Sequence, residues 1–135
     1  MAADVTVDAD RFGATLEQLL NGIGNEVSEK VKPCVREAAK TARSEWRSGA
    51  SSKFGGTGRY ASSIRYRVKE SGMETHADVG SATMPGLPHL LELGHAKVGG
   101  GRVPGREHIA PAADAAFDQF EREIDSAVDD ALRSA

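Results

Sequence analysis

Cysteine and aromatic side chains are scarce in this sequence of 135 residues. Cys34 is the one cysteine, which excludes an internal disulfide and suits a protein that folds in a reducing cytoplasm. Its neighbours Val31, Val35 and Ala38 have helical spacing, so we expect Cys34 on the apolar face of a helix rather than in a reactive pocket. Aromatic residues make up only 5%, so the core must come largely from alanine and aliphatic side chains.

Long apolar runs are also missing. No stretch approaches the roughly 18 apolar residues that span a membrane. The first ten residues, MAADVTVDAD, contain neither the basic nor the apolar region of a secretory signal. We therefore expect a soluble protein made in the cytoplasm, without a membrane partner. A length of 135 residues suits a single domain spanning 1–135.

Motifs for catalysis and cofactor binding are absent as well. The glycine runs GGTG and GGGRVPG lack the Lys-Ser/Thr ending of a phosphate loop, and no serine lies in a G-x-S-x-G context. One set of residues has metal-ligand chemistry, but its spacing is not that of H-E-x-x-H: His89, Glu92, His95 and His108. We expect no enzymatic activity, no cofactor and no metal site.

Charge is what the sequence has in abundance, and it is segregated along the chain. Residues 30–70 hold eleven Lys or Arg and three acids, whereas residues 1–29 hold six acids and one Arg. Residues 107–135 hold eight acids and two Arg. Such blocks indicate either complementary patches between copies of the chain or a nucleic-acid surface. We favour self-complementarity, because the acidic ends oppose a polyanion.

Helical spacing of apolar residues dominates both halves of the chain. After a short alternating segment at Val5–Val7, which we expect to be a strand, one helical pattern covers 12–23 and a second runs from Val27 to Trp46. Gly22 and Gly24 are expected to interrupt the helix between the two patterns, and Pro33 is expected to kink the second helix or to begin a separate segment. A final helix should start with Pro111 as its first residue.

The middle of the chain predicts strands and loops. Residues 62–69 and 73–79 alternate around a turn at Ser71 and Gly72, which predicts an antiparallel hairpin. Residues 48–58 and 97–105 are glycine-rich and predict loops, and HLLELGHA (89–96) fits a strand or a single helical turn. The expected fold class is α+β, a small antiparallel sheet packed against a long N-terminal helix and a C-terminal helix.

Four motifs then occur in a fixed order: TGRYASSI (57–64), VG (79–80), PHLLELGHA (88–96) and GGRVPGREHIAPA (100–112). In this order they resemble the head-tail joining, or tail-completion, family of long-tailed double-stranded-DNA bacteriophages. There, T-G-x-(L or Y)-x-x-S-I begins the hairpin, V-G ends a strand, an E-x-G motif follows, and P-(H or F)-(I or L)-x-P-A leads into the last helix. Two features depart from the pattern: Glu107 stands where proline is common, and Pro33 interrupts the long helix.

The resemblance implies a structural virion protein without catalytic residues. Copies of it would form a six-fold ring in the neck, between head-closure or connector proteins and the tail terminator or tail tube, with passive contact to passing DNA. The protein would be made in the host cytoplasm and end at the head-tail interface.

Loops and basic side chains are the expected contact sites in such a ring. We predict an interface that uses Lys53, Phe54, Arg59, Arg65, Arg67, Lys69, Lys97, Arg102 and Arg106. The alternative is a DNA-binding module that uses the basic segment 30–70, which would give a salt-dependent mobility shift. A zinc hydrolase, the third reading, would bind stoichiometric metal.

Overall fold

The structure is a computed structural model that describes the backbone of residues 12–134 and the side chains of residues 20–134. The strand expected at Val5–Val7 lies outside the described residues. Between residues 12 and 134, eight elements follow one another in the order α1, α2, β1, β2, α3, β3, β4 and α4.

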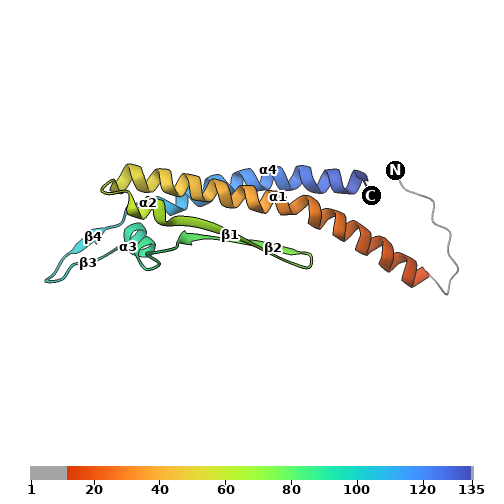
Figure 1. Cartoon of the computed structure of the whole chain (residues 1–135), viewed down its shortest axis with the longest axis horizontal. Helices are drawn as coiled ribbons and strands as arrows, with labels where there is room; N and C mark the ends of the chain where they lie inside the picture. The colour runs from red at the N-terminus through yellow and green to blue at the C-terminus, as the bar shows by residue number, and fades with distance from the viewer. Residues whose placement is uncertain (1–11, 135) are drawn as a thin grey trace.

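Helix α1 (Phe12–Phe54) is the spine of the molecule (Figure 1). It is continuous through Gly22 and Gly24, so the interruption expected there is wrong. Its 43 residues would extend about 64 Å at 1.5 Å per residue. Pro33 lies inside the helix, and Figure 1 shows the N-terminal part of α1 tilting away from the rest. We attribute the bend to the proline ring, which removes one backbone hydrogen bond.

The loop expected at 48–58 is mostly helix, which corrects the prediction from its Gly and Ser content. Helix α1 runs to Phe54, and only residues 55–58 connect it to α2. Tertiary packing outweighs the low helix propensity of this segment, because Trp46 and Ala50 are buried in the core and Phe54 packs against it. A Cβ on Gly49 would lie 3.2 Å from the Cβ of His108, so the glycine permits close packing there.

The predicted hairpin is confirmed, with slightly different bounds. Strands β1 (Ile64–Ser71) and β2 (Glu74–Ser81) pair antiparallel, with Tyr66 opposite Val79 and Arg67 opposite Asp78. Ser62 and Ser63, expected in the first strand, instead end the short helix α2 (Arg59–Ser63). Arg47 of α1 donates hydrogen bonds to the carbonyl oxygens of Ile64 and Ser62, and so holds α1 to the start of β1.

Residues 89–96 were expected to form either a strand or a single helical turn, and the structure contains both, one after the other. Helix α3 (Leu87–Leu93) leads directly into strand β3 (Gly94–Ala96). The segment 97–105, expected to be a loop throughout, contains strand β4 (Arg102–Pro104), which pairs antiparallel with β3. These strands form a second hairpin that projects beyond the end of α1 (Figure 1). We call residues 94–106 the arm.

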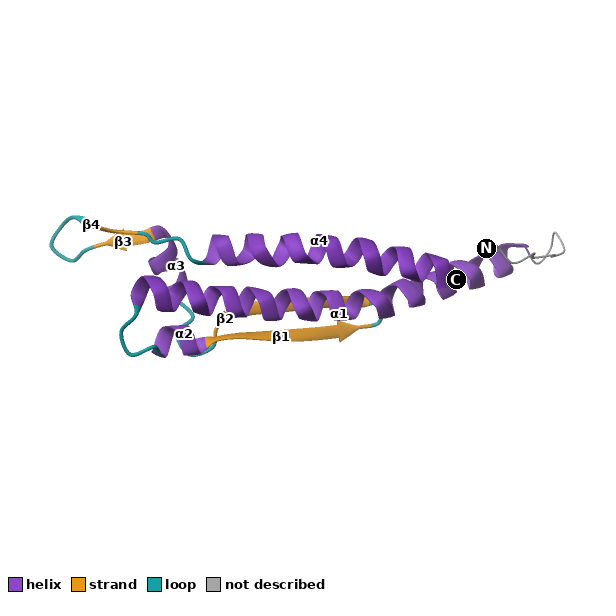
Figure 2. Ribbon diagram, turned by 90° about the horizontal axis from the view of Figure 1, so that it is seen from above, coloured by secondary structure: helices purple, strands orange, loops and turns teal. Residues whose placement is uncertain are grey.

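Helix α4 (Ile109–Ser134) begins two residues before the predicted Pro111. It lies beside α1, while β1 and β2 lie along another side of α1 (Figures 1 and 2). The core at the arm end contains Trp46, Ala50, Ile64 and Ala112, with Tyr60, Val79 and Ile109 packed on it. The α+β fold class is confirmed, and within residues 12–134 the strands form two two-stranded sheets in place of one. None of the described helices combines the length and apolarity needed to cross a bilayer.

Candidate functional site

Glu92 joins three segments at the arm end of the molecule. Its carboxylate accepts hydrogen bonds from the backbone N–H groups of His108, Ile109 and Ala110, at 2.8, 2.9 and 3.0 Å. These are the unpaired donors of the first turn of α4, so a side chain from α3 caps α4 across 16 to 18 residues of sequence. The negative charge also complements the positive end of the helix dipole.

The environment of Glu92 favours its charged form. Burial acts to raise the pKa of its carboxyl, but the hydrogen bonds from the three backbone donors outweigh that effect, and His108 lowers the pKa further when its ring is protonated. The pKa of Glu92 therefore lies below its ordinary value, and the carboxylate is ionised wherever the protein is handled near neutral pH.

A chain of hydrogen bonds runs from Glu92 into the core. His108 is only 2% exposed, and its Nδ1 lies 2.9 Å from the carbonyl oxygen of Arg106 and 3.0 Å from Glu92 Oε1. Both are acceptors, so Nδ1 carries the proton. In the neutral ring Nε2 accepts from the Tyr60 hydroxyl at 2.6 Å, and that hydroxyl accepts from Trp46 Nε1 at 2.9 Å.

Burial raises the pKa of Tyr60, so its hydroxyl stays protonated and able to donate. The rings of Trp46, Phe54 and Tyr60 each meet His108 edge-on, with centroids 4.9 to 6.3 Å apart. Each polar side-chain atom in this series of hydrogen bonds thus has a partner within the fold. The four side chains, Glu92, His108, Tyr60 and Trp46, fix how α1, α2, α3 and α4 meet. Its chemistry is that of a structural joint.

The base of the arm is equally closely fitted. Gly94 has φ 83° and ψ 173°, a conformation that is essentially restricted to glycine. A Cβ there would overlap the carbonyl oxygen of Val103, and one on Gly105 would overlap that of Glu92. Arg102 donates to the carbonyl oxygen of Leu93 at 3.0 Å. These contacts fix the direction in which the arm leaves α3.

The nine predicted interface residues fall into two groups. One group belongs to the arm and to the neighbouring ends of α1 and α2: Lys53, Phe54, Arg59, Lys97, Arg102 and Arg106. Arg106 donates to the carbonyl oxygen of Lys53 at 2.6 Å, and Phe54 is half-buried against the core. The second group lies along β1 with exposed side chains: Arg65, Arg67 and Lys69. The two groups adjoin where α2 leads into β1, because Arg59 and Arg65 line the same shallow pocket.

The four residues with metal-ligand chemistry are not brought together as a set. Glu92 and His108 meet, but within residues 20–134 no three His, Cys, Asp or Glu side chains are arranged to hold a metal ion. Cys34 is 6% exposed on α1, and burial raises its thiol pKa. This matches the apolar helix face expected for it.

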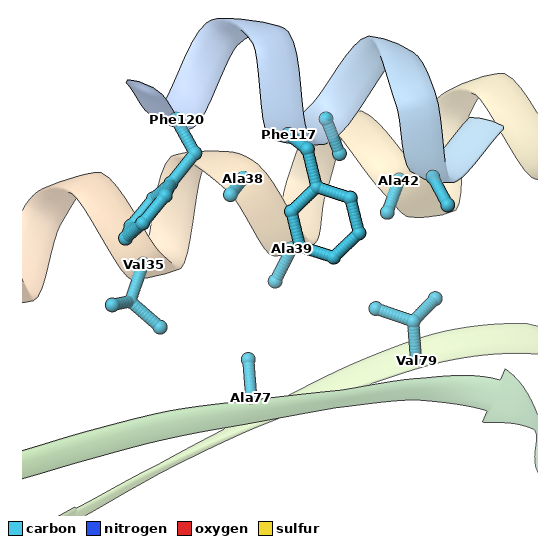
Figure 3. A pocket seen from close by; sticks show the side chains of 10 residues that line it. Val35, Ala38, Ala39, Ala42, Ala77, Val79, Phe117 and Phe120 are labelled. Carbon is cyan, nitrogen blue, oxygen red and sulfur yellow. The ribbon is translucent and has the colours of Figure 1, made fainter. Parts of the chain in front are cut away.

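An apolar groove was not foreseen from the sequence. Its volume is about 270 Å³, and Figure 3 shows α1, β2 and α4 contributing side chains to it. The lining residues are Val35, Ala38, Ala39, Ala42, Ala77, Val79, Ala113, Ala116, Phe117 and Phe120. Phe117 is 64% exposed at its edge. Helical and strand periodicity placed most of these residues on apolar faces, but not Ala39 and Ala116, and the spacing between the elements that leaves the groove open is a tertiary property.

The role of Glu92 was also missed, although a signal for it existed. An acid within the apolar run Leu90 to Leu93 has to find partners, and the E-x-G motif precedes the H-I-x-P-A motif in the same order as the two halves of the cap. Tyr60 and His108 likewise stand inside two of the motifs, and the structure places their side chains in contact.

Residues 10–94 match the family described as "Bacteriophage HK97-gp10, putative tail-component", and this segment includes α1, the first hairpin, α3 and Gly94. The chain belongs to this HK97-gp10-like family of bacteriophage tail proteins, as its motif order predicted. No curated protein and no solved structure matches the chain.

Proposed function

We propose that the protein is a non-enzymatic neck component whose copies form a ring joining the phage tail to the head. The observation that carries the proposal is the family membership over residues 10–94, because tail components are parts of the virion that act by assembly. The finer assignment to the neck draws on the motif resemblance, whose last part, residues 100–112, forms the arm and the capped start of α4.

The shape and charge of the chain support assembly from many copies. Its parts extend along one long helix, with the arm projecting from one end (Figures 1 and 2). The outer face of β1 is basic, whereas α4 carries most of the acids of residues 107–135. Opposite charges on different faces favour a heterologous contact between neighbours, and such contacts close into rings when the rotation permits. We propose six copies, to match a six-fold tail tube.

The neighbouring rings in this proposal are head-closure or connector proteins on one side and a tail terminator or tail tube on the other. We assign contacts with them to two exposed basic residues next to the arm, Lys53 and Arg59. Residues 1–135 act as one domain in this scheme.

Contact with DNA is a second candidate function, favoured by the alignment of Arg65, Arg67 and Lys69 on one exposed face of β1. Asp78 lies 3.9 Å from Arg67 and reduces the positive charge of that face. A DNA-binding module predicts a mobility shift that weakens steeply with salt and is lost in Arg65→Glu with Lys69→Glu. If the wild type gives no mobility shift but the double variant fails to assemble, this face of β1 contacts protein and not DNA.

Disruption of the gene in the phage that encodes the chain tests the main proposal. We expect DNA-filled heads and complete tails that do not join, with the chain supplied from a plasmid restoring infectious particles. Normal virions formed without the chain, or a loss of heads alone, would contradict the neck assignment.

A further inference from the structure

The arm ends in an apolar side chain that makes little contact with its own molecule. Val98, at the tip between β3 and β4, has a relative exposure of 107%. Three glycines follow it, so no bulky neighbour shields it. The arm also carries Lys97, Arg102 and Arg106, and residues 94–106 contain no Asp or Glu. An exposed valine, in a hairpin whose charged residues are all basic, is typical of a surface that contacts a binding partner.

The groove between β2 and α4 has the opposite character. Its lining is apolar, and Phe117 stands 64% exposed at its edge. Asp114 and Glu121 lie three residues before and four residues after Phe117, on the same flank of α4, and Asp118 lies between them. All three acids are exposed, and residues 109–121 contain no Lys or Arg. We call Asp114, Asp118 and Glu121 the acidic rim.

The arm of one molecule cannot fill its own groove in this fold. Its base is fixed by Gly94, Gly105 and the hydrogen bond from Arg102 to Leu93, and it points beyond the end of α1. The groove lies between α1, β2 and α4 (Figure 3), and its α1 residues are 35–42, away from the Phe54 end that carries the arm. Only another molecule can bring such an arm to this groove.

We propose that the arm of one copy docks on the groove of a second copy, with Val98 beside Phe117 and the basic arm residues facing the acidic rim. Apolar contact at the centre with charged residues around it is the usual composition of a protein interface. Three basic residues meet three acidic ones, and both sets belong to this chain, which is why we assign the groove to a second copy.

The contact uses different surfaces on the two molecules, so each copy offers both an arm and a groove. Repetition of such a contact around an axis generates a ring. The inference rests on the proposed function, since it names the surfaces through which copies in that ring would meet.

Cross-linking between two cysteine variants tests the contact. In a Cys34→Ala background, full-length Val98→Cys and Phe117→Cys proteins are mixed and treated with a short bismaleimide. We expect a covalent dimer from the mixture, at a yield at least about tenfold above either variant alone. The same yield in the mixture and in the single variants, or no dimer at all, overturns the proposal.

Matched controls occupy equivalent positions elsewhere. Met73→Cys replaces Val98→Cys, because Met73 is 55% exposed at the tip of the other hairpin. Leu132→Cys replaces Phe117→Cys, because Leu132 is 55% exposed on the same helix α4. Dimers that form as readily with these controls reflect random collisions and count against a specific contact.

Charge reversal adds a second, independent readout. Lys97→Glu in the arm, which leaves the Arg102 contact at its base intact, should lower the cross-link yield by about threefold, and Asp118→Lys in the partner should restore most of it. A charge reversal that has no effect contradicts the proposed pairing of the arm with the acidic rim. A loss that the complementary change does not rescue contradicts it as well.

Other occupants of the groove give different products. A closed monomer from a chain carrying both Val98→Cys and Phe117→Cys would mean that the arm folds back. A Phe117→Cys cross-link to Val7→Cys of the same chain would assign the groove to residues 1–11. Either result overturns the contact between copies.

The inference and the proposed function fail in different ways. Rings that form without a link between positions 98 and 117 remove the inference and leave the neck ring intact. A specific link in a chain whose loss does not impair head-tail joining leaves the contact intact and removes the neck function.

Discussion

Glu92 shows how one side chain can join parts of the chain that are distant in sequence. It lies on α3, yet its three backbone partners belong to the first turn of α4. Without it, these N–H groups would have to find water or remain unpaired at a partly buried helix end. We therefore expect Glu92 to contribute to stability through charge and through geometry.

Glu92→Gln is expected to lower the free energy of unfolding by about 1 to 2 kcal/mol at pH 7, because the amide keeps one acceptor and loses the charge. The folded-state pKa of Glu92 is lowered, so its contribution is present above the unfolded value of about 4.3. That contribution is lost as the pH falls through the folded pKa. Urea denaturation at several pH values measures the difference between the two proteins.

Glu107→Gln is the matched control, since Glu107 is exposed and stands one residue before His108. It should change stability by less than about 0.5 kcal/mol. A difference between wild type and Glu92→Gln that does not shrink below pH 4 would show that the charge is not the cause.

Tyr60→Phe tests the hydrogen-bond chain to His108. The variant keeps the ring but leaves Trp46 Nε1 and His108 Nε2 without their partner, which should cost about 1 to 3 kcal/mol. Tyr66→Phe serves as the control, because Tyr66 is half-buried with Arg43 over its ring, a contact that phenylalanine retains. Equal losses in the two variants, measured by chemical denaturation, would argue against a special role for Tyr60.

At the scale of elements, the arm depends on backbone geometry that side chains cannot replace. Gly94→Ala should destabilise the protein by more than about 2 kcal/mol, from its φ and ψ and from overlap with Val103. Gly99 also has positive φ, but a Cβ there has open space, so Gly99→Ala should cost only about 1 kcal/mol. Thermal and urea unfolding compare the two. Similar costs would mean that the close contact at the base of the arm is unimportant.

Much of the helical and hairpin structure could be predicted from periodicity alone. The spacing of Val35, Ala38 and Ala42 predicted the inner face of α1, and the alternation around Gly72 predicted the pairing of β1 with β2. The segment 48–54 could not be predicted, because its helix depends on contacts of Trp46, Ala50 and Phe54 with residues far along the chain. A deletion of residues 51–55 would remove Phe54 from the core, so it would disturb the fold and not merely shorten a loop.

The candidate site was less predictable than the fold. Strands β3 and β4 have three residues each, too few for a periodic signal, and the register depends on Gly94 and Gly105 fitting between backbones. The groove depends on the distance between α4 and β2. Motif order found the right family, but only the fold shows which motif residues touch.

At the scale of the whole molecule, the proposal that residues 1–135 form one domain predicts cooperative unfolding. Trp46 is the single tryptophan and lies 7% exposed in the core shared by α1, β1 and α4. Its fluorescence and the far-ultraviolet circular dichroism of the helices should therefore report the same transition midpoint. Two separate midpoints would indicate parts that unfold independently.

In this account, the segregated charges and the projecting arm act in contacts between copies of the chain. The basic block of residues 30–70 lies on α1, α2 and β1, whereas the acidic block of residues 107–135 lies mainly on α4. The exposed Val98 and Phe117 belong to opposite partners of the proposed contact. Contacts between copies of this kind should weaken as salt screens the charges, while the fold of each copy persists.

Electron cryomicroscopy of virions that carry a bulky label on the C-terminus of this chain tests the central claim most directly. The account predicts label density as a ring between the head and the first tail ring, with the same rotational symmetry as the tail. Label along the tail, at its distal end, or missing from the virion would contradict a role in joining head and tail.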